Sequence, residues 1–234
     1  LCLNGRCRYS TTGAGITLTA LLISSTFPQT WSAWSLWFIF TGLFVATNFY
    51  SLKFSGNINL QLSTVVAVAA VLLFSPGAAV LSGAIGKAIS CVLRRKRTEQ
   101  LIFNTSQVIL YTAASSLTLN ALAEIPWKPG SIQSWVGMAL AVGLIMGINI
   151  LLTGTVIALE THQSLRKSWR YVGKVTLLQD PAQVSLGVLS ALLVDSYPWA
   201  LALIPIPVVI LYHALRRERE VEEQRVQLLE QNTG

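Results

Sequence analysis

Polar side chains recur inside long apolar stretches of this sequence, and they are the groups that could bind a solute. In one stretch they are spaced three and four residues apart, which places them on one face of a helix. Six residues share this setting and are the candidate ligand-binding residues: Asn104, Gln107, Tyr111, Asn149, Asp180 and Gln183. Amides in an apolar environment either hydrogen-bond across helices or line a binding site, and the sequence leaves both readings open.

Pro181 lies directly after Asp180, in the apolar stretch that also carries Gln183. A proline removes a backbone hydrogen bond from a helix and frees a carbonyl group. Such a break is tolerated at membrane depth where it is buried or lines a cavity. We therefore predict a hinge at Pro181.

No motif typical of an enzyme is present. The sequence has no Gly-rich phosphate loop, no Gly-x-Ser-x-Gly and no His-Glu-x-x-His. Asp180 has no neighbouring acid or base for general acid–base catalysis, and the three cysteines have no metal-ligand spacing. We predict a protein that is not an enzyme, with no catalytic residue, no metal site and no cofactor.

The composition indicates the environment of these stretches. Of 234 residues, 53% are hydrophobic and 12% are charged, against roughly 25% charged residues in an average soluble domain. Twenty-seven charged residues, 17 basic and 10 acidic, cannot cover the surface of a soluble fold of this length. The predicted fold class is all-α, a polytopic helical bundle in the lipid bilayer.

A helix needs about 20 apolar residues to cross the bilayer core, and eight segments approach this length. Ser75 and Pro76 alone separate the third and fourth, which predicts a tight helical hairpin. Two small-residue motifs, Gly143-x-x-x-Gly147 and Ala79-x-x-x-Gly83, predict close helix contacts. The predicted segments are 12–27, 31–50, 58–74, 77–93, 101–123, 132–159, 169–194 and 199–215.

Basic residues in the connections set the predicted orientation, because Lys and Arg accumulate on the cytoplasmic side. With eight spans, nearly all of the basic residues fall on one side of the membrane, and Lys128 lies on the opposite side. Lys87 is inside the fourth segment, and its side chain can extend towards the basic run Arg94–Arg97. We predict a multi-pass protein of the inner (plasma) membrane with both termini cytoplasmic. The net charge of +7 then gives no reason to expect a nucleic-acid partner. Eight of these residues are predicted to contact lipid headgroups: Arg94, Arg95, Lys96, Arg97, Arg166, Lys167, Arg216 and Arg217.

The last segment continues into a charged stretch of helix-forming residues. Ala214, Val221 and Leu228 recur every seven residues, which is typical of a short coiled-coil seam. We predict a homodimer formed partly through this helix, with a larger membrane complex as an alternative. The expected domains are a cytoplasmic segment (1–11), a transmembrane domain (12–212) and a cytoplasmic linker helix (213–234).

Several of these motifs together resemble the N-terminal multi-span membrane domains of bacterial signalling proteins. The resemblance rests on Leu72–Ala79, the basic run Arg94–Arg97, Phe103-Asn104-x-x-Gln107, Ile148-Asn149 and the late Arg-rich helix. It implies a sensory or anchoring domain that relays a signal through its C-terminal helix. The output module would be a GGDEF diguanylate cyclase, an HD-GYP phosphodiesterase or a histidine kinase, none of which is in this chain.

Two other functions stay open from the sequence. The chain also resembles, to a lesser degree, the substrate-binding subunits of energy-coupling-factor vitamin transporters, which implies a protein that binds or transports a small amphipathic, vitamin-like solute. The third possibility is an accessory subunit of a membrane complex.

Overall fold

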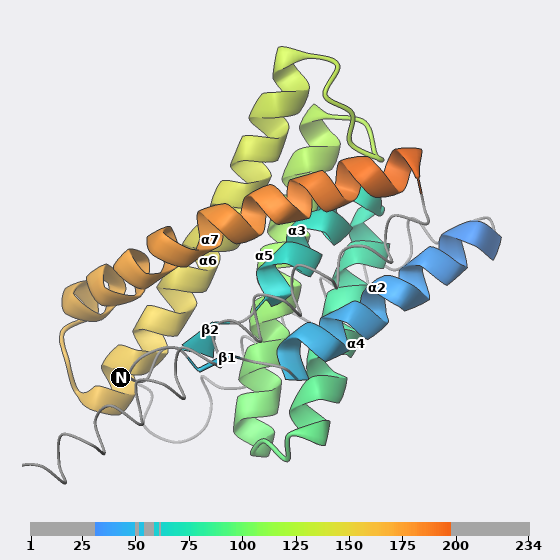
Figure 1. The fold of residues 1–234 in the computed structure, drawn as a ribbon. Helices are drawn as coiled ribbons and strands as arrows, with labels where there is room; N and C mark the ends of the chain where they lie inside the picture. Colours follow the sequence, from blue (N-terminus) through green and yellow to red (C-terminus); the bar gives the residue numbers. More distant parts are fainter. Residues whose placement is uncertain (1–30, 50–51, 54–58, 61, 198–234) are drawn as a thin grey trace, which may run out of the picture.

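The structure is a computed structural model, and it describes residues 31–49, 52–53, 59–60 and 62–197 (Figure 1). Within these residues the predicted helical fold is confirmed. The predicted first and eighth segments and the linker helix lie outside the described residues. The helices are α2 (Trp31–Phe49), α3 (Ser63–Leu73), α4 (Pro76–Leu93), α5 (Thr98–Leu122), α6 (Ile132–Thr161) and α7 (Leu165–Ser196).

Two of these helices, α4 and α6, are long and apolar enough to cross a membrane. The two halves of α7, Leu165–Leu177 and Asp180–Val194, form a third candidate span if they are counted together. Trp34–Phe49 and Ser63–Leu73 are apolar but shorter. The chain is therefore a helical membrane protein with a few apolar spans, and the count of eight stays a prediction.

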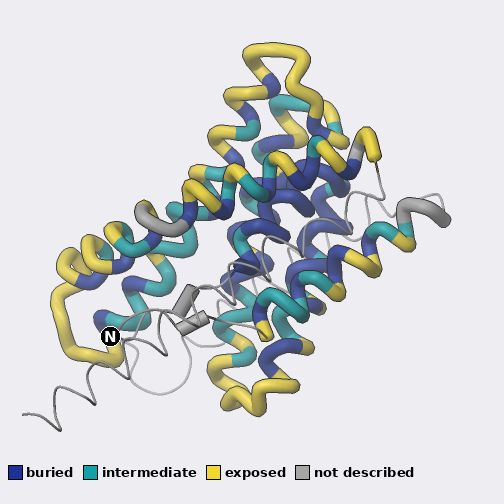
Figure 2. Tube along the Cα trace, viewed as in Figure 1, coloured by how far each residue is buried: buried dark blue, intermediate teal, exposed yellow. Residues whose placement is uncertain are grey.

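Helix α3 forms the centre of the core. All residues from Val65 to Leu73 are buried, which fits a helix that is apolar on every side (Figure 2). At 11 residues the helix is about 16 Å long, half the thickness of the bilayer core. Its neighbours include α2, α7 and α5.

The prediction of a continuous helix over 58–74 is wrong in its first part. A short strand β2 (Asn59–Leu60) pairs antiparallel with β1 (Leu52–Lys53), with Leu52 opposite Leu60, and α3 begins only at Ser63. Apolar residues alternate with polar ones from Ile58 to Leu62, a period of two that favours a strand over a helix.

The helix ends follow from local chemistry. Helix α4 begins with Pro76 in its first turn and ends in a Schellman motif, in which Arg95 adopts φ 51° and Lys96 N–H donates to Cys91 O at 3.0 Å. Helix α6 begins where the Ser131 side chain accepts a hydrogen bond from Ser134 N–H, and it ends at His162 with φ 53°.

Helices α3 and α4 are joined by the short connection predicted for a hairpin, but α4 packs less against α3 than against α2 and α5. Helices α2 and α4 run parallel. Trp37 Nε1 donates to Ala78 O at 2.8 Å, and one turn further Thr41 Oγ1 donates to Ser82 Oγ at 3.1 Å.

One of the two small-residue motifs makes the predicted contact. A Cβ atom on Gly83 would lie 2.8 Å from Val108 Cγ1, so α4 and α5 are in close contact there. Gly143 and Gly147 have no described atom within 4 Å of that position, so no described helix makes the predicted contact through them. Helix α6 approaches α7 at Gly154, where a Cβ atom would overlap Trp169 Cδ1.

The connection from α5 to α6 closes one end of the bundle over α3. Trp127 is buried, its backbone N–H donates to Leu72 O at 2.8 Å, and its Nε1 donates to Ser134 O at 3.0 Å. The first bond satisfies a carbonyl in the last turn of α3, which has no partner within its own helix. Trp127 thus joins the loop to both α3 and α6.

Candidate functional site

The polar residues of α5 and α6 form a clasp. Gln107 Nε2 donates to Asn149 Oδ1 at 2.7 Å and to Thr153 Oγ1 at 3.0 Å. Thr153 also lies within 3.4 Å of Asn149 Oδ1. Gln107 and Asn149 are thus partners of each other, which is the interhelical bonding that the sequence left open beside a binding site, and nothing in the sequence pattern indicated Thr153.

Asn104 does not join this clasp. Its Nδ2 donates to Gln100 O of its own helix at 2.6 Å, and the residue is half-buried. An asparagine bonded to the preceding turn contributes to one helix only. The predicted face of α5 therefore divides into a locally bonded residue and the two inward residues Gln107 and Tyr111.

Asp180 and Gln183 lie on the face of α7 that is turned into the bundle. Residues at helical spacing along this face are all buried: Val172, Thr176, Asp180, Gln183, Ser190 and Val194. Asp180 is 7% exposed and Gln183 is 5% exposed. Both side chains therefore point away from the lipid and into the protein.

These two buried side chains each carry an oxygen atom without a hydrogen-bond partner. Asp180 Oδ2 and Gln183 Oε1 have none among the described residues. No basic side chain described here compensates the charge of Asp180. A buried polar group without a partner costs about 1–3 kcal/mol, and more for a charged group. Four buried hydroxyl oxygens of the described residues also lack a partner, those of Thr105, Ser115, Ser116 and Ser168, but Asp180 is the only carboxylate in this set. Asp180 and Gln183 are therefore the candidate ligand-binding pair.

Tyr111 connects this pair to α5. The residue is 8% exposed, and the carboxylate of Asp180 interacts electrostatically with its phenol group. Tyr111 and Asp180 are thus within electrostatic range of each other although they are 69 positions apart, the difference of their residue numbers. The candidate site consists of Asp180 and Gln183, and Tyr111 on α5 is a buried neighbour of Asp180 by this electrostatic interaction.

The predicted break at Pro181 is a bend in a longer helix. Helix α7 continues from Leu165 to Ser196, whereas the sequence predicted an interrupted segment over 169–194. Its two halves differ in direction by 49°. The missing N–H of Pro181 leaves Leu177 O without its usual helical donor, which allows the bend beside Asp180.

The second half of α7 packs against the first turns of α3. A Cβ atom on Gly187 would lie 2.8 Å from Val65 O and 2.9 Å from Val68 Cβ. Gln183 precedes Gly187 by one turn, so the candidate site lies close to the amino end of α3. The contact at Gly187 places the half-helix that carries Asp180 and Gln183 against α3.

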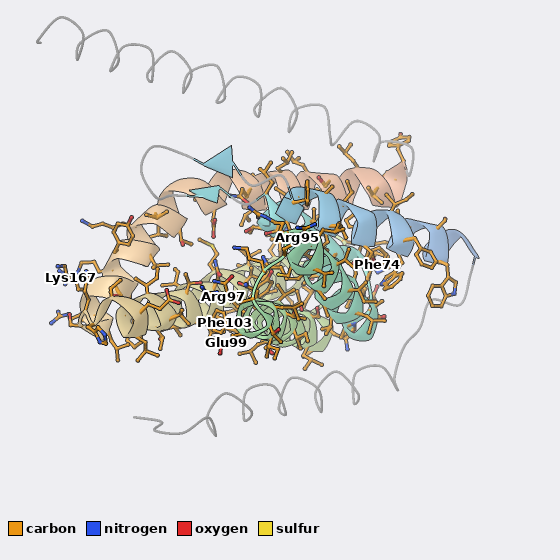
Figure 3. All side chains as sticks on the ribbon, turned by 90° about the horizontal axis from the view of Figure 1, so that it is seen from below. Phe74, Arg95, Arg97, Glu99, Phe103 and Lys167 are labelled. Carbon is orange, nitrogen blue, oxygen red and sulfur yellow. The ribbon has the colours of Figure 1, made fainter. Side chains whose placement is uncertain are left out.

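The basic residues of the two connections gather at one end of the bundle. Helices α5 and α6 are antiparallel, so the α4–α5 turn and the α6–α7 connection share an end (Figure 1), while Lys128 lies at the other. Figure 3 views the molecule from below, with three of these side chains labelled. Six predicted headgroup residues are exposed there: Arg94, Arg95, Lys96, Arg97, Arg166 and Lys167. Arg216 and Arg217 lie outside the described residues.

Two side chains from this end donate hydrogen bonds to Asn48, at the end of α2. Lys87 Nζ donates to Asn48 Oδ1 at 2.7 Å, and Arg94 Nη1 donates to Asn48 O at 3.0 Å. Lys87 therefore binds the end of α2 within the protein. Over the described residues, no three His, Cys, Asp or Glu side chains are grouped so that they could hold a metal ion.

A family model described as MASE9 matches residues 22–216, which include every described helix and the candidate site. No curated protein and no solved structure shows a significant match. The match covers more than half of the chain, and it agrees with the apolar spans and with the resemblance found in the sequence. The chain belongs to the MASE9 family of membrane-associated sensor domains, which typically form the N-terminal sensors of bacterial signalling proteins.

Proposed function

We propose that this domain senses a stimulus at Asp180 and Gln183 and relays it through α7 and the C-terminal helix to a cytoplasmic output module. Membrane-associated sensor domains of this kind are non-catalytic. The observation that carries the proposal is the pair of buried, unpartnered oxygens beside the bend of α7. A stimulus that supplies a partner to these oxygens would favour one angle between the two halves of α7 over another.

The position of α7 in the chain supports the relay. It is the last described helix, and the predicted eighth segment and linker helix follow it. Its first half packs on α6 at Trp169, and its second half packs on α3 at Gly187. A change of angle at Pro181 would therefore move the end of α7, where the route to the linker helix begins.

The orientation and the dimer belong to the same proposal. The basic end of the bundle faces the cytoplasm, both termini lie on that side, and two copies pair through residues 213–234. The exposed basic residues of both connections support this orientation. The seven-residue repeat of Ala214, Val221 and Leu228 supports the pairing.

The relay is tested by fusing the full chain to a diguanylate cyclase domain and measuring cyclic dinucleotide production in membranes. Pro181→Ala restores the missing N–H and favours a straighter α7, so we expect a change in basal output of at least about threefold, equivalent to about 0.7 kcal/mol. The matched control is Pro129→Ala, in the exposed α5–α6 connection. Unchanged output for Pro181→Ala, or an equal change for both variants, would contradict the relay.

The dimer is tested by cysteine crosslinking in membranes on a background without native cysteines. A cysteine at Leu228, in the predicted seam, should crosslink within the dimer. A cysteine at Glu223, about 200° around the helix from Val221, should crosslink much less. Equal crosslinking at both positions, or none at Leu228, argues against the seam.

Binding of a small solute, the alternative function from the sequence, is favoured by the same unpartnered oxygens of Asp180 and Gln183. We include it in the sensory proposal as the event that is sensed. No observation in the described residues favours transport or an accessory role over sensing.

A further inference from the structure

We propose that Asp180 and Gln183 bind the primary ammonium group of a small organic solute. This inference rests on the proposed sensory function, because it names the chemical class of the stimulus. Both unpartnered atoms, Asp180 Oδ2 and Gln183 Oε1, are hydrogen-bond acceptors. The ligand must therefore present hydrogen-bond donors.

The charge of the site favours a ligand with one positive charge. Asp180 is the only acidic residue of the candidate site, and no described basic side chain compensates it. A single cationic group would neutralise one carboxylate. A divalent ion would leave an excess positive charge in an apolar environment, and it takes about six or more oxygen ligands, which these residues do not provide.

The kind of acceptor favours an ammonium group. A primary ammonium group carries one positive charge and N–H donors but no acceptor. Asp180 and Gln183 each offer one oxygen without a partner, and the two residues lie about one turn apart on the buried face of α7. One nitrogen can donate to both oxygens.

The amide donors of α5 are used by other partners. The Nε2 of Gln107 is used by Asn149 and Thr153, and the Nδ2 of Asn104 is used by Gln100. The Tyr111 hydroxyl interacts electrostatically with Asp180 but donates no hydrogen bond to Oδ2.

The experiment measures the melting temperature of the full chain in detergent at constant ionic strength. Methylammonium is the probe for the ammonium group, and tetramethylammonium is its control, because it carries the same charge without an N–H donor. Sodium and potassium ions test whether an alkali ion is the occupant. We expect saturable stabilisation by methylammonium and none beyond the ionic-strength effect from the other three.

Two variants locate the binding. Asp180→Asn removes the charge, and Gln183→Met removes the second acceptor while keeping the length of the side chain. Each should raise the half-saturating methylammonium concentration by at least about tenfold, the effect of losing one charge-assisted hydrogen bond. Gln107→Leu breaks the clasp outside the site, so it should lower the melting temperature and leave the half-saturating concentration unchanged.

The outcomes separate this inference from the relay. Three outcomes would overturn the ammonium site. Tetramethylammonium could stabilise the chain as much as methylammonium does, or only sodium or potassium could stabilise it. The third is that both site variants respond to methylammonium as the parent chain does. Stabilisation by lowered pH alone would overturn the site as well, because a proton on Asp180 would then suffice. If the cyclase fusion still responds to Pro181→Ala in these cases, the relay stands without the ammonium ligand.

Discussion

Gln107 Nε2 on α5 lies 2.7 Å from Asn149 Oδ1 on α6, and this hydrogen bond joins the two helices in the middle of their contact. The side chains of Gln107 and Asn149 therefore have hydrogen-bond partners within the protein. Asp180 and Gln183 on α7 are buried to a similar degree but keep an oxygen each without a partner. The structure thus separates amide groups that join two helices from buried oxygens that have no hydrogen-bond partner among the described residues.

Replacement of Gln107 by leucine should destabilise the domain by about 1 kcal/mol, a typical value for a hydrogen bond between membrane helices. The physical reason is that Asn149 and Thr153 lose their donor from α5. Equilibrium unfolding in mixed micelles measures the change in free energy.

Asn104→Leu is the matched control, because the Asn104 side chain bonds only within α5. It should change the free energy of unfolding by less than about 0.5 kcal/mol. A double-mutant cycle of Gln107→Leu with Asn149→Leu should give a non-zero coupling energy. Additive effects would mean that the two side chains do not interact.

The sequence was sufficient to locate α2 and α4 to α7, because runs of apolar residues between basic or turn-forming connections are a local signal. The length of α3 was missed. The alternation over Ile58–Leu62 is a strand signal within a stretch whose overall hydropathy resembles that of a span. An average over a span-length window conceals a period of two.

The partners of the polar residues could not be derived from the sequence. Gln107 meets Asn149 because α5 and α6 pack antiparallel in one register, and a register is a property of two helices. For the same reason the motif Gly143-x-x-x-Gly147 did not indicate that α6 meets α7 at Gly154. A small-residue motif shows that close packing is possible without showing which face of the helix is covered.

Gly154→Ala should destabilise the domain by about 1–3 kcal/mol, because its Cβ atom would overlap Trp169 where α6 meets α7. The nearest atoms include the backbone of Trp169 at 3.2 Å, which cannot rotate away as a side chain can. Thermal unfolding in detergent measures the change.

Gly147→Ala, two turns earlier in α6, is the control. With no described atom within 4 Å it should be neutral, or stabilising by up to about 1 kcal/mol through helix propensity. Similar losses of stability for both variants would show that Gly147 is also covered, for example by a second copy of the chain.

Trp127→Phe should destabilise the domain by about 1–2 kcal/mol, because it removes the hydrogen bond from Nε1 to Ser134 O in a buried environment. Trp135, whose ring lies 5.1 Å from that of Trp127, is half-exposed and suits as a control. Trp135→Phe should have less than half the effect in the same unfolding assay. If Trp135→Phe is the more damaging variant, the loop is not held by Trp127.

The orientation of the domain predicts which connections a membrane-impermeant thiol reagent reaches. On a cysteine-free background, Arg95→Cys should be labelled only after the cells are opened, because Arg95 lies in the exposed basic turn assigned to the cytoplasm. Lys128→Cys, in the exposed α5–α6 connection at the other end, should be labelled in intact cells in which the reagent can pass the outer envelope. Labelling of both positions from one side would contradict a membrane crossing by α5, and a reversed pattern would contradict the assignment of the basic end to the cytoplasm.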